Sequence, residues 1–476
     1  MNKEIVLTHQ MDQSKSCTKE DKWRADMIIR INETDTTSDT HVYTEILKPP
    51  KALVNVKPES YRPQILTIGP LHEMLSGSPV LYDCKALCVS KFMRGHGISD
   101  VEELMQRLFY DPSDLHIHYS GLPKYSSESL QLLVTVDTIF IREFLLFMPT
   151  EWDSILEEHT QFCTLCNNDI TYKQVGRDLF VMGNQIPLSF LVKLIEEFPK
   201  KQEFDWDELQ DGLLYAVATN DPFFMSQSLS LTEIVQIFET PELVNCNHLL
   251  DCLYVWVVRE RLQKNGGNGI NPCRFPRLRN LFGTKQAPQK KAKFRDRLPT
   301  ASQLSRAGIR FRANEGAISV MHYDESNHRF ELPRLVVYNG TEDVLRNLLA
   351  HEQTSTIRGE FTKYAVIMDS LIDTPEDVAI LTKAGVLENH LGSDERLVKL
   401  WNDMCITVWN RPCEKWDNMI RDILHHYENP WRPMYVEFRE KYFSRPWLTI
   451  SLLVAFLLLL FSLLQTGYTI AGYYQI

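Results

Sequence analysis

The sequence predicts a mainly α-helical protein with a small antiparallel β-sheet in its second half and a single C-terminal transmembrane helix. Several long segments carry apolar residues at helical spacing, and short β-branched or alternating segments cluster between residues 309 and 338. The segment 446–476 contains no charged side chain. A composition of 44% hydrophobic and 24% charged residues is ordinary for globular proteins, so we expect packed cores before that last segment.

The uncharged segment has the length and composition of a membrane span. Residues 447–464 read WLTISLLVAFLLLLFSLL, and thirteen of these eighteen are Leu, Ile, Phe or Val. Their insertion into a bilayer is favourable by roughly 5 kcal/mol. A helix extended to Tyr468 would be roughly 33 Å long, enough to cross a hydrocarbon core of about 30 Å. We therefore predict a transmembrane helix over 446–468 and a short tail over 469–476. Its marker residues are Trp447, Leu448, Leu457, Leu458, Leu464 and Tyr468.

The flanking charges predict the orientation of this span. Arg432, Arg439, Lys441 and Arg445 precede it, whereas residues 468–476 contain no Lys or Arg. The positive-inside rule therefore places the bulk of the chain in the cytosol, at the plasma membrane or an endomembrane, with the tail on the far side. Ten unpatterned cysteines agree with a reducing compartment. The glycosylation sequons at Asn32 and Asn339 are then expected to be unmodified.

Composition also predicts how the chain is divided. Residues 1–40 are polar and read as a flexible N-terminal arm. Glycines and prolines interrupt any regular element over 265–300, which we interpret as a linker. The linker separates a helical domain, 41–264, from an α+β domain, 301–445.

Positive charge is concentrated from Arg274 to Arg312. This segment contains twelve basic residues and one acidic residue, although the whole chain has a net charge of −11. Three interpretations stay open. The segment is a solvated loop, or it docks on the acidic remainder of the chain, or it lies on anionic cytoplasmic lipid, at about 1 kcal/mol per basic residue near the surface. Nucleic acid is not an expected partner, because few aromatic residues are interleaved here.

Four helices have clear signals. The segment Ser129–Phe147 is apolar nearly all round, which predicts a central buried helix in which Asp137 is buried and paired. After Pro187, apolar residues at helical spacing predict an amphipathic core helix. Thr374-Pro375-Glu376-Asp377 combines a hydroxyl cap, a proline and acids, and Ser393 caps the next helix. The strand signals are Ile309–Arg312, Ile318–Tyr323, Arg329–Leu332 and Leu335–Tyr338.

The search for catalytic and metal motifs yields little. The sequence contains no nucleophile elbow, phosphate-binding loop or zinc-peptidase helix, so we expect no cofactor and no enzymatic activity. His159, Cys163 and Cys166 supply three zinc ligands without a fourth. His116 and His118 would share one strand face without a carboxylate or cysteine. Neither group is expected to hold a metal.

A few residues are candidates for a site nonetheless. His72 beside Glu73 is the best catalytic candidate, although a structural histidine next to a Gly-Pro turn is the more usual reading. The others are Asp137 and the Asn184-Gln185 pair that precedes Pro187. If the chain were an enzyme, these residues would be the place to look.

The motifs as a set resemble a known family. Residues 61–72, YRPQILTIGPLH, are similar to the opening motif Y-x-P-x-x-x-S-I-G-P-x-H of the plant family called domain of unknown function 247. Further signatures follow in order: LLVTVDTIFIREFLLF, DLFVMGNQIPLSFLVKL, TASQLSRAGIRF, LPRLVVYNGTEDVLRNLLAHEQ, LIDTPEDVAIL and LENHLGSDERLVKLWN. Together they cover about residues 45 to 470. Gly183 departs from the pattern, since an acid is usual there.

The resemblance implies a single C-terminal span in a plant family that is mostly uncharacterised, with some grass members linked to pollen self-incompatibility. Our first hypothesis is a membrane-anchored recognition or signalling protein that binds another protein. The alternative is an unrecognised enzyme with a site near His72, Asp137 or Asn184-Gln185.

Overall fold

A computed structural model describes residues 45–72, 79–109, 113–119, 125–148, 162, 165–166, 168–199, 205–224, 246–258, 297–314, 316–355, 359–428 and 446–474. They fall within one unit of the chain, Glu45–Ile476. The predicted arm 1–40, most of the linker 265–300, and the residues His159 and Cys163 lie outside the described residues.

Helices dominate the first half, as predicted, and α6 is the central one. The elements are α2 (Lys51–Val56), η1 (Pro58–Tyr61), α3 (Pro79–His96), α4 (Val101–Leu108), α5 (Ser113–Ile117), α6 (Ser127–Phe147), α9 (Asp169–Asp178), α10 (Leu188–Glu197), α11 (Asp205–Asn220) and α13 (Leu249–Val258). Helix α6 contacts α3, α4, α5, α10 and α11. Because it is apolar nearly all round, it can bury its whole circumference, which confirms the prediction of a buried central helix.

The second half adds α14 (Ala301–Arg306), η7 (Ile318–Val320), α15 (Thr341–Thr354), α16 (Glu360–Leu371), α17 (Pro375–Lys383), α18 (Asp394–Met404) and α19 (Glu414–Tyr427). Two predicted helix starts are confirmed. Thr374 and Asp377 form a capping box at α17, and the Ser393 side chain accepts from the backbone N–H of Arg396 at α18. Helix α18 buries Leu397, Leu400, Trp401 and Met404, the predicted apolar face.

Two small sheets lie in the second half. The first has the order β1-β3-β2, formed by β1 (Arg310–Asn314), β2 (His322–Asp324) and β3 (Arg329–Pro333). Strands β2 and β3 are an antiparallel hairpin, but β1 and β3 are parallel, so the sheet is mixed rather than wholly antiparallel. The reason is the connection through η7, after which the hairpin inserts β3 between β1 and β2.

The second sheet pairs β4 (Leu335–Val337) with β5 (Leu387–Asn389) in parallel. Strand β4 was predicted, whereas β5 was not. The residues of β4, Leu-Val-Val, are β-branched or apolar, whereas those of β5, Leu-Glu-Asn, include no residue that favours a strand.

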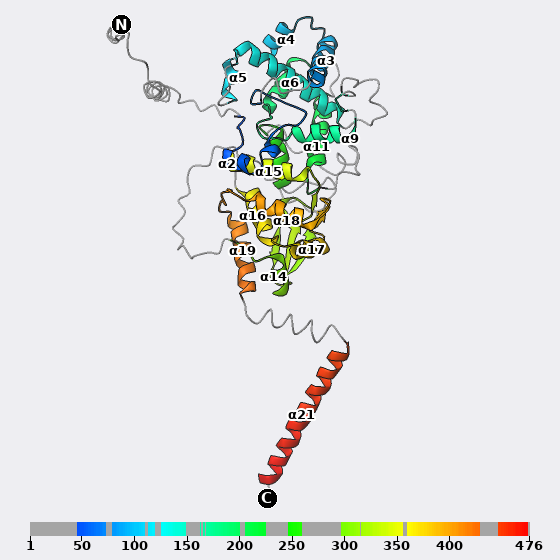
Figure 1. The fold of residues 1–476 in the computed structure, drawn as a ribbon, viewed down its shortest axis with the longest axis vertical. Helices are drawn as coiled ribbons and strands as arrows, with labels where there is room; N and C mark the ends of the chain where they lie inside the picture. Colours follow the sequence, from blue (N-terminus) through cyan, green and yellow to red (C-terminus); the bar gives the residue numbers. More distant parts are fainter. Residues whose placement is uncertain are drawn as a thin grey trace, which may run out of the picture. The chain divides into compact units, whose positions relative to one another are not determined.

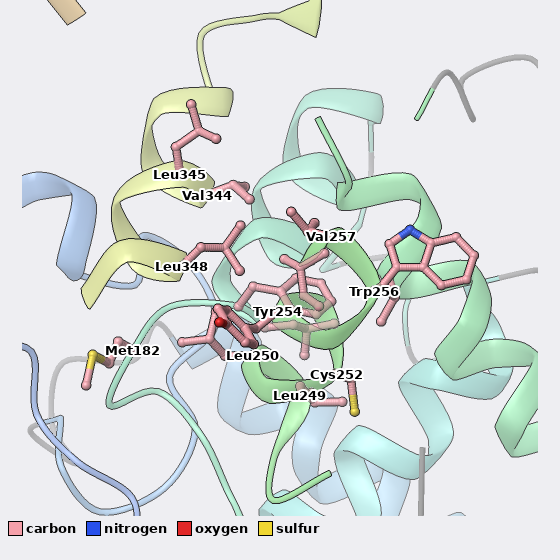
Figure 2. Close-up of a cluster of buried hydrophobic side chains, with 14 of the residues drawn as sticks. Met182, Leu249, Leu250, Cys252, Tyr254, Trp256, Val257, Val344, Leu345 and Leu348 are labelled. Carbon is pink, nitrogen blue, oxygen red and sulfur yellow. The ribbon is translucent and has the colours of Figure 1, made fainter. Parts of the chain in front are cut away.

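Helices from the two sides of the predicted linker share one core. Figure 2 shows Leu250 and Tyr254 of α13 in one buried cluster with Leu348 of α15. The Tyr254 hydroxyl donates to Glu352 of α15, which also accepts the backbone N–H of Phe361 at the start of α16. The division into domains 41–264 and 301–445 stays a prediction, but the residues on its two sides are in direct contact.

The last element, α21 (Pro446–Tyr474), is a helix of 29 residues. It continues through residues 469–474, where the prediction is a tail, and the hydroxyls of Thr466 and Thr469 donate to backbone carbonyls one turn earlier, so these polar side chains are satisfied within the helix. Its segment Leu453–Ile470 has a mean hydropathy of 2.0 and is not buried against the rest of the chain. By length and composition, α21 can cross a membrane.

Candidate functional site

The opening motif forms an irregular segment with bends, Gln64–Gly69, that lies outside any sheet, so side chains must satisfy those of its backbone groups that are buried. Asp178, at the end of α9, is the main acceptor. One of its carboxylate oxygens accepts from the backbone N–H groups of Gln64, Ile65 and Leu66 at 2.9, 2.7 and 2.9 Å. Its other oxygen accepts from Arg177 at 2.8 Å. The Asp178 side chain is thereby fully used, at 0% exposure.

Asn184 continues this pattern along the same segment. Its side-chain oxygen accepts from the backbone N–H of Ile68 at 2.6 Å, and its amide nitrogen donates to the carbonyl of Leu66 at 2.8 Å. Gln185 binds a different part of the chain: its side-chain oxygen accepts from the backbone N–H of Leu250 in the first turn of α13 at 3.2 Å. Pro187 is predicted to lie in the first helical turn, but the structure makes it the N-cap residue of α10, one position before the helix begins at Leu188.

Asp137 holds the far end of the segment. It accepts from the backbone N–H of Gly69 at 2.8 Å and pairs with Lys85 of α3, which donates in turn to the carbonyl of Thr67 at 2.7 Å. The prediction that Asp137 is buried and paired is confirmed. Gly69 has a φ of +68°, and a Cβ there would lie 2.7 Å from the carbonyl oxygen of Gln185, so only glycine fits without a backbone shift.

We call the four side chains around this segment the clasp: Lys85, Asp137, Asp178 and Asn184. The structure therefore brings together two of the sequence candidates, Asp137 and Asn184, around the opening motif, whereas the side chain of Gln185 binds backbone groups elsewhere. Burial raises the pKa of the Asp178 carboxyl, while the three backbone N–H groups and Arg177 act in the opposite direction. Chemically, the clasp stabilises a backbone conformation, because its polar atoms bind the chain itself.

His72 follows the clasped segment, but its Nε2 makes no hydrogen bond to it. Its Nε2 is buried and has no hydrogen-bond partner in the part of the chain described. Burial, followed by the positive charge of Lys48, lowers the pKa of His72 to about 4, so the ring is neutral near pH 7. A Cβ on Gly183 would lie 3.8 Å from this Nε2. The glycine thus stands where the family pattern would put an acid next to His72.

A second buried polar group joins the two halves, and sequence reasoning missed it. Asp251 of α13 and His351 of α15 are 3.1 Å apart, and the ring of His248 lies 5.1 Å from that of His351. Burial acts to raise the pKa of Asp251, but the bond to His351 and the nearby imidazoles lower it to about 2. Burial lowers the pKa of His248 to about 3. An acid on the otherwise apolar segment Leu249–Val258 was the available signal.

Helix α15 supplies further links across the two halves. Asn347 donates to the carbonyl of Ser60 and accepts from the backbone N–H of Met182, both at 2.8 Å. Asp343 accepts from Arg177 at 2.8 Å, so the clasp and α15 are joined through one guanidinium. No periodicity or short motif predicts such bonds between distant segments.

The metal candidates are not assembled in the described residues. His116 lies in helix α5 and His118 in the turn after it, so the prediction that both share a strand face is wrong. A short run of five residues is too brief for the sequence to decide between helix and strand. Cys166 is buried. Among the described residues, no three His, Cys, Asp or Glu side chains are grouped to hold a metal ion.

The transmembrane markers lie on α21. Trp447, Leu457, Leu458, Leu464 and Tyr468 are all exposed, and Leu448 belongs to the same helix. A row of exposed leucines on a 29-residue helix is the pattern of a lipid-facing or partner-covered element.

Comparisons with known proteins define the class as a plant protein of unknown function, because the profile of the family DUF247 matches residues 46–461. The chain belongs to this family. A putative UPF0481 protein of Arabidopsis thaliana is 27% identical over 491 aligned residues, which cover 89% of this chain and 90% of the relative. Another UPF0481 protein of Arabidopsis thaliana is 22% identical over 437 residues, covering 90% and 86%. No solved structure matches the chain.

Replacing Asp178 by alanine should strongly destabilise the protein. The change leaves three backbone N–H groups, one buried and two partly buried, without their acceptor, and we expect a loss of about 3–5 kcal/mol in the free energy of unfolding. Denaturant unfolding of the full-length protein in detergent measures it. Asp83→Ala, which removes an exposed acid of α3, is the matched control and should change stability by less than about 0.5 kcal/mol. Equal stability of the two variants would contradict the role of the clasp.

Stability should fall between pH 8 and pH 5, and His248 should account for part of the fall. Folding lowers the pKa of His248, so on acidification the unfolded state binds a proton before the folded state does. The stability that neutral His248 contributes is therefore complete above the unfolded pKa of about 6.5 and declines below it. At pH 5 the loss is about 2 kcal/mol for each such histidine, with His72 adding in the same direction.

The substitution His248→Asn separates this effect from the rest. Asparagine retains an acceptor for the backbone N–H of Asp251, which His248 now binds at 3.2 Å, but does not titrate. Melting temperatures at pH 8 and pH 5 should therefore differ less in this variant than in the wild type. The exposed His425→Asn is the control and should retain the wild-type difference. The same difference in all three proteins would contradict the assignment.

Proposed function

We propose that this chain is a non-enzymatic plant protein that α21 tethers to the plasma membrane or an endomembrane, and that binds another protein from the cytosolic side. The observation that carries the tether is α21 itself. Its uncharged residues extend over 29 positions, and the segment Leu453–Ile470 packs on no other part of the unit. Leaving so many apolar side chains in water is unfavourable by about 25 cal/mol per Å² of surface, and a bilayer removes that cost.

The clasp supports binding rather than turnover. Asp137, Asn184 and Gln185 were the residues on which an enzymatic alternative depended, and each uses its polar atoms to bind backbone or Lys85. A catalytic group must reach a substrate proton or atom instead.

The enzymatic alternative keeps one candidate residue, His72. A folded and correctly localised His72→Ala protein that is wholly inactive in a biological complementation assay would favour the enzyme.

An exposed tryptophan supports a protein partner. Trp409 is 76% exposed and Ile406 is 45% exposed, on the loop between α18 and α19. The loop backbone is held firmly, because the Gln353 side chain accepts from the N–H of Trp409 at 3.1 Å and donates to its carbonyl at 3.0 Å. Arg411 donates to the carbonyls of Ser355 and Gln353. Large aromatic side chains on a rigid backbone are typical anchors of interfaces, since little entropy is lost on binding.

A narrower form of the proposal is a role in pollen self-incompatibility. Its support is the family membership alone, since some grass members of the family are linked to that process. The other proposed partner is anionic lipid at the basic segment Arg274–Arg312, supported by its concentration of charge.

Deleting residues 446–476 should release the protein from membranes into the soluble fraction. Only this segment among the described residues is long and apolar enough to span a bilayer, so the remainder should be extracted by alkaline washing. Fractionation of plant cells that express the full-length and shortened chains, followed by immunoblotting, measures it. A shortened protein that resists alkaline washing would contradict the tether.

Glycosylation of the protein in the same membranes tests the orientation of the chain across the bilayer. Asn339 is exposed in the turn before α15, so a glycan could be attached if this part of the chain faced the lumen. An endoglycosidase-sensitive change in mass that Asn339→Gln abolishes would place the bulk of the chain on the other side of the membrane.

Replacing Trp409 by alanine should weaken partner binding by at least tenfold without lowering the melting temperature, because an interface aromatic is typically worth about 2 kcal/mol or more. Cross-linking in native membranes, quantified by mass spectrometry against the wild type, measures the loss. Ile170→Ala, at an equally exposed apolar position of α9, is the control and should leave the cross-linked set unchanged. Identical sets for all three proteins would exclude Trp409 as an anchor.

A further inference from the structure

The outer face of the β1-β3-β2 sheet is rich in arginine. Arg310 of β1 pairs in register with Arg329 of β3, and Arg312 with Glu331, while His322 of β2 lies on the other side of Glu331. The alternate residues Phe330 and Leu332 are buried on the opposite face. We call the exposed set the arginine face: Arg310, Arg312, Arg329 and His322 around Glu331.

Positive charge on this face is only partly compensated. Glu331 is shared among Arg312 at 3.9 Å, Arg329 at 4.0 Å and His322 at 3.9 Å, all near the limit of an ion pair. Arg310 forms no ion pair with any described residue, although it stands directly beside Arg329. Like charges in register destabilise a sheet, so a fold that keeps them is expected to meet an anion there.

Asp324 of β2 stands in register opposite Arg329 at the edge of this face and brings a second negative charge to it. One carboxylate oxygen of Asp324 accepts from the backbone N–H of Ser326 at 3.0 Å and the other from the side-chain amide of Asn327 at 2.7 Å. These bonds hold the hairpin turn and lower the pKa of Asp324 to about 2, so its carboxylate is ionised. The three guanidinium groups therefore outnumber the two carboxylates of Glu331 and Asp324, and Arg310 forms an ion pair with neither.

The four arginines of the basic segment that lie among the described residues form two pairs with different surroundings. Arg297 donates to Asp369 of α16 at 2.6 Å, and Arg306 donates to Glu376 of α17 at 3.0 Å, so both dock on acids of the chain itself. Arg310 and Arg312 come next in the sequence and instead face outward, with 61% of the Arg312 side chain exposed. Intramolecular docking thus accounts for the first pair of arginines and leaves the second available.

The sheet is also the part of the fold from which the chain departs toward α21. His426, in the last turn of α19, contacts the carbonyl of Ala307 at 3.2 Å, and its ring lies 4.3 Å from that of His328 in the hairpin turn. Figure 1 shows α14, α17 and α19 gathered around these strands. Residues 429–445 then lead to α21, and seventeen residues span at most roughly 60 Å. Any membrane that holds α21 is therefore within reach of the arginine face.

We propose that the arginine face docks on the anionic phospholipid headgroups of the membrane that α21 crosses, which lays the sheet against the bilayer surface. The inference rests on the proposed membrane tether. Guanidinium groups bind phosphate oxygens through paired N–H donors, which suits Arg310 and Arg329 side by side. The face extends the basic segment 274–312 onto a rigid platform, and the tether keeps the headgroups at high local concentration.

Chemical modification of arginine tests the docking on the full-length protein. The protein is reconstituted with its globular part outside vesicles of phosphatidylcholine, with or without phosphatidylserine, and phenylglyoxal modification of each arginine is followed by mass spectrometry. Arg310, Arg312 and Arg329 should be protected only in the vesicles with phosphatidylserine, and high salt should remove the protection. Arg94 and Arg396, exposed elsewhere on α3 and α18, should react equally in both.

A double substitution, Arg310→Gln with Arg329→Gln, supplies the second measurement. At about 1 kcal/mol for each arginine, the ratio of docked to free protein, read from the protection of Arg312, should fall about 30-fold. The variant Arg94→Gln with Arg396→Gln loses the same charge and should keep full protection. Melting of both variants checks that they are folded.

Two outcomes overturn the proposal in different ways. If the protein resists alkaline washing in both kinds of vesicle but Arg310 reacts at the same rate in both, the docking is wrong and the tether stands. If alkaline washing releases the protein from both, the tether fails and the docking fails with it.

Discussion

The first half of this protein depends on one carboxylate, that of Asp178, which accepts three consecutive backbone N–H groups of an irregular segment and pairs with Arg177. A segment outside a sheet has no ladder partner, and each N–H that is buried without a partner would cost about 1–3 kcal/mol. Arg177 in turn binds Asp343 of α15, so the same interaction connects the opening motif to the second half. Burial of so many polar groups is tolerated because nearly all are satisfied.

Much of the helical architecture could be predicted from periodicity and capping residues. The helix Ser129–Phe147 and the starts at Thr374 and Ser393 follow from local chemistry, and so does the burial of Asp137. The pairing of β1 with β3 could not be predicted, because a parallel register depends on the path of the connection rather than on either strand. Strand β5 could not be predicted because its residues, Leu-Glu-Asn, do not favour a strand.

The candidate site shows the same division. The sequence singled out Asp137 for its apolar surroundings, in which a polar residue requires partners, and Asn184 and Gln185 for the motif that precedes Pro187. It did not identify their partners, several of which are backbone groups more than sixty residues away, nor Asp178 at the end of α9. His351 and Asp251 meet only in the folded chain.

The bonds between η1 and α15 have a consequence for synthesis on the ribosome. Lys57 and Glu342 are 285 residues apart, and Ser60 and Asn347 are 287 apart, yet both pairs close in the native fold. At about 5–20 residues per second, the opening motif waits roughly 15–60 s for α15 to emerge. During that interval the apolar side chains of the first half are incompletely covered, which makes the nascent chain a natural substrate for chaperones that bind exposed hydrophobic segments.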